Sequence, residues 1–333
     1  MKKKLLLVLI CTLVIITQVG CGTKEPVSKT GFYLNTSCQI DIMDMNKTEG
    51  EKIIDQVFEE CGNYEKMLSR TVKGSDIYKI NHAKGKPVTV APETAYLIKT
   101  SIEMSEKTNG QFDITVGKLT DLWNFSSDNP KKPKDADIKE AVKTIGYKNI
   151  VIKGNTVQLK NPETWLDLGA IAKGYIADKL TASLEEKGVK TGIVNLGGNI
   201  VTIGAKADGS PWNIGIETPY SDRNDIVGAV KMKDQTVVTS GTYERFFEEG
   251  GKKYHHILNP KTGYPVNSDI EGVSILSKKG NSGYCDAYST ISLLLGKEKA
   301  KEFMSKQDGF EFMIIDTKGK DFNSKGFNIE YKE

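Results

Sequence analysis

The stretch Leu166-Asp-Leu-Gly-Ala-Ile-Ala-Lys-Gly-Tyr175 joins a short apolar run to a predicted helix. The run ends in Asp167, Gly169 predicts a turn, and the helix is expected to begin near Ala170. A helix N-terminus offers free N–H groups and a positive dipole end to an anion, and Lys173 adds a cation nearby. The spacing is not the Gly-x4-Gly-Lys-[Ser/Thr] of a Walker phosphate loop. Taken alone, the junction is compatible with either an anion site or plain packing.

Outward from this junction, helices are expected mainly before it and short strands mainly after it. Thr48-Glu-Gly-Glu51 has the pattern of a capping box and predicts the start of a first helix. Further expected elements are a strand over Tyr33–Ile42, helices over Pro92–Gly110, Asp137–Ile145 and Tyr284–Leu295, a hairpin over Asn149–Lys160, short strands after residue 190 and a strand over Glu311–Ile315. This order predicts an α+β fold with mixed or antiparallel sheets and flanking helices, rather than a doubly wound sheet. The polar stretch Ser126–Lys134 is expected to be a loop inside one domain.

The N-terminus has the features of an export signal. Lys2, Lys3 and Lys4 precede an apolar run over Leu5–Ile16, which is shorter than the ~20 residues of a spanning helix. Small residues before Cys21 resemble the bacterial lipobox, in which the cysteine is lipidated. We therefore expect a signal peptide over residues 1–20, a lipid-anchored tether over 21–30 and one domain over 31–333, held at the cell membrane and facing outside the cytoplasm. The alternative is an ordinary signal peptide with an incidental cysteine.

Composition excludes some classes of function. Of the 333 residues, 38% are hydrophobic and 27% charged, as expected of a globular protein. Without the three lysines of the signal, 43 basic residues face 43 acidic ones. A general nucleic-acid binder needs a basic surface, so none is expected. Cys38, Cys61 and Cys285 are too widely spaced to indicate a disulfide framework or a cysteine-based zinc site, and we expect them to be small buried residues.

Two segments carry residues suited to catalysis. Asp286 and Thr290 lie four residues apart in a predicted helix, so their oxygen atoms can reach one cation, and oxygen ligands suit Mg²⁺. The alternative is a helix-capping Asp with a Thr bonded back to the helix. His255 and His256 are adjacent in a predicted strand and so point to opposite faces. One of them can serve a site as a proton carrier, whereas His82 lies in a polar stretch and is given no role.

Seven segments in order resemble the ApbE family, the Mg²⁺-dependent FAD:protein FMN transferases, between about residues 32 and 315. They are Leu68-Ser69 with Ser75-Asp-Ile-Tyr-Lys-Ile-Asn81, Phe112-Asp-Ile-Thr-Val-Gly117 with Leu122-Trp123, Leu166–Tyr175, Asn195-Leu-Gly-Gly-Asn199, Ser240-Gly241 with Tyr243-Glu-Arg245, His256-Ile257 with Pro260-Lys-Thr-Gly263, and Asp286 with Ser289-Thr290. The resemblance implies a single domain of two lobes with FAD bound between them. Each segment alone can be read as a turn or as core, but seven in order are far more specific.

The resemblance also implies the roles of individual residues. The metal ligands would be the backbone carbonyl of Ala170, the carboxylate of Asp286 and the Thr290 region including Ser289. FAD-contacting positions match Leu34, Tyr78, Gln111, Phe112, Asp113, Asp167, Lys173, His256 and Ile257. Two positions depart from the family: Leu34 stands where many members have Met, and Ala170 replaces a frequent Gly, which a backbone ligand tolerates.

The activity implied is Mg²⁺-dependent transfer of FMN from FAD to a Ser or Thr hydroxyl of an acceptor protein, with release of AMP. His256 is the predicted base that takes the proton of the hydroxyl. Acceptors in such families include extracytoplasmic flavoproteins and subunits of membrane redox complexes. Two alternatives stay open: a pyrophosphatase that hydrolyses FAD to FMN and AMP, and a non-enzymatic flavin-binding lipoprotein.

Overall fold

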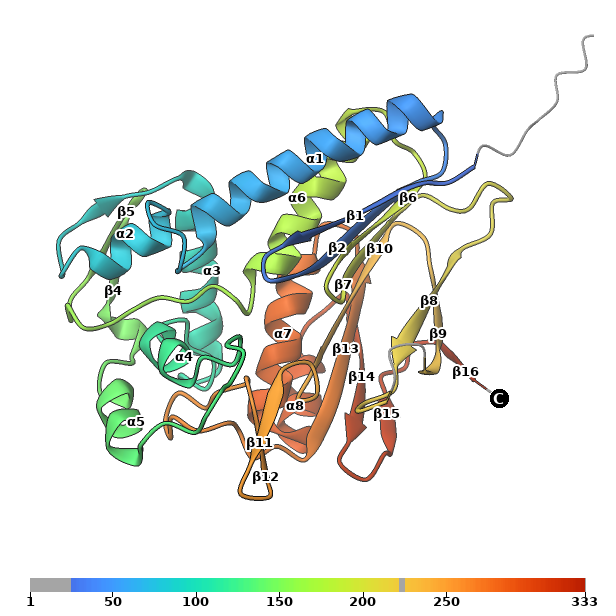
Figure 1. The fold of residues 1–333 in the computed structure, drawn as a ribbon. Helices are drawn as coiled ribbons and strands as arrows, with labels where there is room; N and C mark the ends of the chain where they lie inside the picture. Colours follow the sequence, from blue (N-terminus) through green and yellow to red (C-terminus); the bar gives the residue numbers. More distant parts are fainter. Residues whose placement is uncertain (1–24, 222–224, 333) are drawn as a thin grey trace, which may run out of the picture.

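An eight-stranded antiparallel sheet forms the centre of the protein (Figure 1). The computed structural model describes residues 25–221 and 225–332. The strand order is β1-β2-β6-β7-β10-β13-β14-β15, and each strand is antiparallel to its neighbours. The bounds are β1 Val27–Tyr33, β2 Thr36–Ile42, β6 Gly192–Leu196, β7 Asn199–Ile203, β10 Gln235–Gly241, β13 Ile270–Lys278, β14 Phe310–Asp316 and β15 Asp321–Asn323.

Helices cover one face of this sheet, and a second sheet covers part of the other (Figure 1). The helices are α1 Lys47–Leu68, α6 Ala172–Glu186, α7 Ser282–Leu295 and α8 Lys297–Met304, and the second sheet joins β8 Trp212–Glu217, β9 Ile226–Met232 and β16 Ile329–Tyr331 in the order β16-β9-β8. Because both faces are covered, the middle of β13 is buried on both sides. β8 alternates between buried and exposed residues, as expected of an outer layer.

The remaining elements form a smaller lobe beside the helices. They are α2 Asp76–His82, β3 Val88–Thr89, α3 Pro92–Lys107, α4 Gly117–Trp123, α5 Asp135–Val142, the short helix η1 Tyr147–Asn149, β4 Ile150–Lys153, β5 Thr156–Leu159 and the hairpin of β11 Phe246–Glu249 with β12 Lys252–His255. Trp123 is buried under α5 and the hairpin, where its Nε1 donates to the Gly263 carbonyl at 2.8 Å. This bond ties α4 to the loop that follows β12.

The predicted α+β class with antiparallel sheets and flanking helices is confirmed, and so is the hairpin over Asn149–Lys160. The strand predicted over Tyr33–Ile42 is found as β2, which begins at Thr36, and the turn of Leu34 and Asn35 separates it from β1, which the sequence did not predict. The predicted capping box is also wrong: α1 begins one residue earlier, and the side chain of Asn46 accepts a hydrogen bond from the Glu49 amide at 3.0 Å. β1 begins at Val27, inside the segment predicted as tether. None of the helices in the described residues is long and apolar enough to span a bilayer.

Gly174 lets α6 and α7 approach closely enough to share the site described below. A Cβ at this position would lie 2.9 Å from the Asp286 Cβ and still closer to the Ser282 carbonyl group. Backbone cannot move aside as a flexible side chain does, so the two helices would have to part. We expect Gly174→Ala to lower the free energy of unfolding by about 3 kcal/mol, measured by urea denaturation.

Gly62 in α1 supplies a matched control for this substitution. A Cβ there would meet only the Tyr33 ring, at an ordinary contact distance of 3.5 Å. Gly62→Ala should therefore raise stability by up to about 1 kcal/mol through helix propensity. Equal effects of the two substitutions would show that the α6–α7 contact at Gly174 is not tight.

Candidate active site

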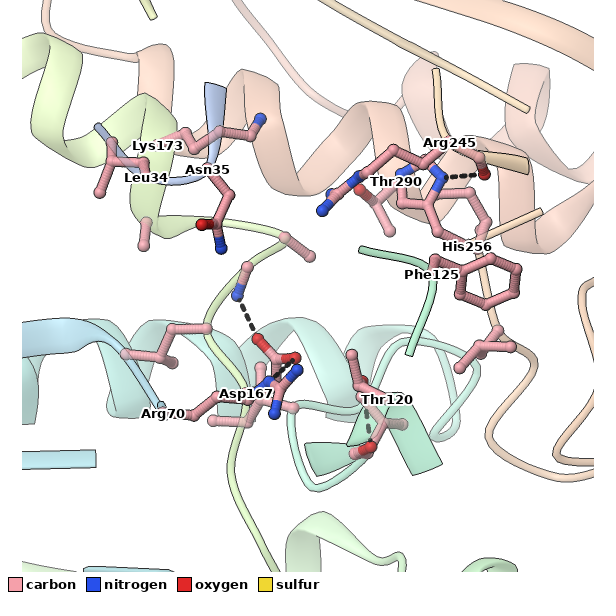
Figure 2. Close-up of a pocket in the computed structure, with 18 of the residues that line it drawn as sticks. Leu34, Asn35, Arg70, Thr120, Phe125, Asp167, Lys173, Arg245, His256 and Thr290 are labelled. Carbon is pink, nitrogen blue, oxygen red and sulfur yellow. Dashed lines mark hydrogen bonds and ion pairs between the residues drawn. The ribbon is translucent and has the colours of Figure 1, made fainter. Parts of the chain in front are cut away.

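A cavity of about 620 Å³ lies where the smaller lobe meets one end of the main sheet. Its walls come from the β1–β2 turn, the chain after α1, the segment 112–126, the junction before α6, the chain after β10, the loop after β12 and one face of α7. Figure 2 shows side chains from these separate segments turned toward a common space. Pockets of this size with a few convergent polar groups are typical of small-molecule sites.

Leu34 reaches the cavity from the turn between β1 and β2. Leu34 and Asn35 have φ values of 55° and 57°, in the left-handed region that costs a non-glycine residue roughly 1 kcal/mol. Two contacts with α1 hold this turn: the Leu34 amide donates to the Glu65 carboxylate at 3.1 Å, and the Tyr33 ring stacks on Phe58 with centroids 5.4 Å apart. The strained turn is therefore fixed in place by tertiary contacts.

The junction before α6 lies along the cavity wall. Buried Asn81 clamps it through two hydrogen bonds to the backbone of Leu166, at 2.7 and 2.9 Å. The Asp167 carboxylate accepts from the Gly169 amide at 2.8 Å and from Arg70 Nε at 2.9 Å. Arg70 also pairs with Asp121, so one guanidinium ties together three segments of the wall.

Helix α6 begins at Ala172, two residues after the predicted start. Ile171 is the residue at its N-cap, and its side chain makes no capping hydrogen bond. Ala170 and Ala172 both line the cavity. Two amides of the first turn are already engaged, because the Ala172 amide donates to the Leu168 carbonyl at 2.9 Å and the Gly174 amide donates to the Asp286 carboxylate at 3.0 Å.

Lys173 and Asp286 form an ion pair at this wall. Lys173 Nζ lies 3.3 Å from Asp286 Oδ1, and the Gly174 amide donates to Asp286 Oδ2 at 3.0 Å. Asp286 is only 1% exposed, so its negative charge is buried and needs these partners. The close approach of α6 and α7 at Gly174 therefore positions both charges.

Three of the four predicted metal ligands line the cavity: Ala170, Asp286 and Thr290. Ser289 does not, and its hydroxyl bonds instead to the Ser240 hydroxyl and the Asp286 carbonyl, both at 2.8 Å. The Ser289 hydroxyl is thus already engaged with β10 and with its own helix, and its role as a metal ligand stays a prediction. Within residues 25–221 and 225–332, no three His, Cys, Asp or Glu side chains gather as a metal cluster. The predicted set contains only one carboxylate.

His256 faces the cavity, and His255 faces away from it, as predicted for adjacent residues. His256 Nδ1 lies 3.3 Å from the Arg245 carbonyl, which can only accept, so Nδ1 carries the proton and Nε2 is left with a lone pair. Desolvation, with the positive charge of Arg245, lowers the pKa of His256 well below its ordinary value. The imidazole is therefore neutral at pH 7 and able to accept a proton. His255 is held by the Val266 carbonyl and the Ile257 amide.

Not all predicted flavin contacts lie at the cavity. Phe112, Asp113, Asp167, Lys173 and Ile257 line it. The Asp113 carboxylate is already engaged by the amides of Thr115 and Tyr147, each at 2.8 Å. Tyr78 and Gln111 are not among the lining residues. Tyr78 stacks on His82 with ring centroids 3.8 Å apart, and its contact with FAD stays a prediction.

Several cavity residues were not predicted from the sequence. Among them are Asn35, Arg70, Thr120, Phe125 and Arg245, which Figure 2 labels, and Glu244. Glu244 Oε1 accepts from the Gly241 amide at 2.9 Å. The segment Tyr243-Glu-Arg245 was part of the family resemblance without an assigned role, and Asn35 directly follows Leu34. Lys173, Arg70 and Arg245 bring three cations to the cavity wall, which also carries six carboxylates: Glu65, Asp113, Asp121, Asp167, Glu244 and Asp286. Arg70 and Lys173 are engaged in ion pairs with three of these carboxylates.

The sequence is similar to one family of proteins over most of its length. The model of the ApbE family matches residues 34–314. The chain is 34% identical over 274 residues to an FAD:protein FMN transferase of Klebsiella pneumoniae, covering 81% of this chain and 84% of that protein. It is 31% identical over 329 residues to an FAD:protein FMN transferase of Treponema pallidum, covering 92% of this chain and 90% of that protein.

Solved structures are similar over nearly their whole length. The ApbE protein of Thermotoga maritima superposes with a TM-score of 0.82 at 33% identity, covering 91% of this chain and 98% of that one. The flavin transferase ApbE of Vibrio cholerae superposes with a TM-score of 0.80 at 27% identity, with the same coverage. The similarity in fold and the similarity in sequence thus both cover the part of the chain that forms the cavity.

Proposed function

This chain belongs to the ApbE family, and on that premise we propose that it is a transferase that moves FMN from FAD to a Ser or Thr hydroxyl of an acceptor protein, releasing AMP. One observation carries the proposal: a single cavity brings the Lys173–Asp286 pair and a neutral His256 together. The first suits a diphosphate, and the second suits removal of a proton from a hydroxyl. A protein that only stored flavin would need no such base.

The residues present are compatible with Mg²⁺. The Asp286 carboxylate, the Ala170 carbonyl and the Thr290 hydroxyl offer three oxygen atoms from two elements that line one cavity. Mg²⁺ usually keeps several waters and takes oxygen atoms from a substrate phosphate, so a small protein ligand set is sufficient. When bound, the ion would neutralise charge on the phosphate oxygens. Lys173 Nζ lies 3.3 Å from Asp286 Oδ1, so the ion would share this carboxylate with Lys173.

Different side chains of this protein stabilise charge, accept the proton and orient the base in the proposed reaction. Lys173 and the positive dipole end of α6 stabilise negative charge on the diphosphate. His256 Nε2 takes the proton of the acceptor hydroxyl as its oxygen forms a bond to the flavin-side phosphorus. The bond from that phosphorus to the bridging oxygen breaks, and AMP leaves with the bridging oxygen. Arg245, whose carbonyl holds Nδ1, fixes the orientation of the ring.

The position of the enzyme is part of the proposal. Cys21 lies outside the described residues, and we propose that it carries a lipid anchor in the membrane, with the signal peptide removed. Only five residues lie between Cys21 and the start of β1 at Val27. The six steps from Cys21 to Val27 span at most about 20 Å, so the enzyme would work close to the outer surface of the membrane. Its acceptor is then an extracytoplasmic flavoprotein or a subunit of a membrane redox complex.

One incubation distinguishes the proposed activity from its alternatives. The full chain is mixed with FAD, Mg²⁺ and a candidate extracytoplasmic acceptor, and the products are followed by intact-protein mass spectrometry and nucleotide chromatography. We expect the acceptor to gain the mass of an FMN moiety while AMP appears in equal amount. AMP with free FMN and an unchanged acceptor would indicate a pyrophosphatase, and unchanged FAD would indicate a binding protein. Either of these results would contradict transfer.

A further inference from the structure

One edge of the main sheet, at β1, has free main-chain groups. β1 lies at the end of the strand order and pairs only with β2 among the described strands (Figure 1). The two-residue turn after β1 makes Tyr33 and Thr36 a hydrogen-bonded pair. Because the direction of the main-chain groups alternates along an antiparallel strand, those of Ser28, Thr30 and Phe32 point away from β2. Within residues 25–221 and 225–332, these N–H and C=O groups make no other main-chain hydrogen bond.

The opposite edge of the sheet, at β15, is protected. β15 has only three residues, and Lys301 Nζ lies 4.2 Å from the centre of the Phe322 ring. Short edge strands and lysine side chains are means by which proteins prevent the addition of a foreign strand. β1 has seven residues, and its one lysine, Lys29, turns toward α1 and pairs with Asp55 at 2.6 Å. β1 is therefore open to pairing with another extended chain.

Phe32 adds an exposed apolar side chain to this edge, next to the cavity. It is 73% exposed, more than any other large hydrophobic residue in the described part of the chain. Ser28 and Thr30 are exposed with it. Phe32 lies two residues before Leu34, which lines the cavity, and the β1–β2 turn points toward the smaller lobe (Figure 1). The free edge of β1 therefore leads toward the mouth of the cavity.

We propose that β1 is the docking site for the acceptor protein, an inference that rests on the flavin transfer proposed above. An extended segment of the acceptor adds to the free edge of β1 as a further strand, with main-chain hydrogen bonds to Ser28, Thr30 and Phe32. An apolar side chain of the segment packs on Phe32, and the part that runs beyond β1 carries the Ser or Thr into the cavity. The acceptor is the partner that has to come to this place, because its hydroxyl must enter the cavity beside Leu34.

Hydrogen exchange at β1 tests the docking directly. The full chain in detergent is labelled with deuterium, with and without the candidate acceptor of the transfer assay, and read by mass spectrometry with fragmentation to single residues. The outward amides of Ser28, Thr30 and Phe32 should exchange fast in the free enzyme and about tenfold or more slowly with acceptor. Transfer without this slowing would overturn the proposal. Slowing that rises with enzyme concentration in the absence of acceptor would also overturn it, because a second copy of the chain would then occupy the edge.

Substitutions on β1 test the docking by kinetics. Phe32→Ala removes an exposed side chain, and Thr30→Pro removes an outward N–H, which an edge strand tolerates. We expect each to raise the KM for the acceptor about tenfold or more and to leave the KM for FAD unchanged. Thr30→Ala, which keeps the N–H, and Phe322→Ala, at the protected edge, are the matched controls. Both should leave the two KM values within about twofold of those of the unchanged enzyme.

The results distinguish the docking site from the proposed activity. An unchanged KM for the acceptor in Phe32→Ala and Thr30→Pro would overturn docking at β1 and leave flavin transfer standing. Slowed exchange at β1 without transfer would support the docking site and contradict the activity, and the absence of both would contradict both. If Thr30→Pro does not fold, Phe32→Ala and hydrogen exchange still decide, because the Phe32 side chain lies outside the core.

Discussion

Replacing Asp286 with alanine is expected to lower kcat/KM for flavin transfer by roughly a thousandfold or more, as for loss of a principal electrostatic element of an active site. The carboxylate is the only one in the proposed metal set, and it is paired with Lys173 at 3.3 Å. Its removal would leave Lys173 without its ion-pair partner and the metal without its charged ligand. Initial rates of FMN transfer, measured across a Mg²⁺ titration, would show the loss at every metal concentration.

Asp286→Asn is the matched control. The amide keeps the size of the side chain and an oxygen to accept from the Gly174 amide, but it removes the charge. We expect the melting temperature to stay closer to that of the unchanged protein than in Asp286→Ala, while activity is lost in both. If either variant retains full transfer activity, Asp286 is not a metal ligand. If activity returns in Asp286→Asn, its role is to hold α6 against α7.

Helical spacing predicted part of this site correctly. Asp286 and Thr290 share a face of α7 because they are four residues apart, and both line the cavity. The same rule cannot distinguish Ser289, which lies three residues after Asp286. Its hydroxyl is taken up by Ser240 on β10, a strand about fifty residues earlier in the chain. Only the packing of α7 on the sheet decides which of the two hydroxyls faces the cavity.

The contact between Tyr78 and His82 follows from their spacing in a helix. The family match assigned this residue to FAD, although Tyr78 and His82 are spaced i, i+4 in a helix. Such pairs are neighbours on a helix surface, and here the rings stack at 3.8 Å. The buried face of α2 is formed by Ile77, Ile80 and Asn81, which leaves Tyr78 outside the cavity wall.

The β1–β2 turn could not be predicted from propensity. Two-residue hairpin turns with both φ values positive prefer Asn-Gly or Asp-Gly, and Leu34-Asn35 gives no such signal. Contacts with Glu65 and Phe58 on α1 stabilise it instead. Strain and long-range contact at the site are the features that sequence patterns do not encode.

Replacing His256 with alanine is expected to lower kcat by a hundredfold to ten-thousandfold, with a smaller change in the KM for FAD. His256 is neutral at pH 7 because its pKa lies well below the ordinary value, and its Nε2 is free to accept the proton of the acceptor hydroxyl. Protonation at low pH would remove this lone pair. Transfer by the unchanged enzyme should therefore be constant near pH 7 and fall only at pH values below about 6.5. That acid limb should be absent from His256→Ala, as measured by kcat against pH.

His255→Gln tests whether this effect belongs to His256 alone. His255 lies on the same chain but faces away from the cavity, and the amide nitrogen of Gln can still donate to the Val266 carbonyl. We expect this variant to keep the acid limb and most of kcat, because its side chain does not reach the reacting atoms. If His256→Ala instead loses stability and keeps kcat, the imidazole is a structural group held by the Arg245 carbonyl. The proton of the acceptor would then have to go to another group of the cavity, of which Glu244 is the nearest in sequence.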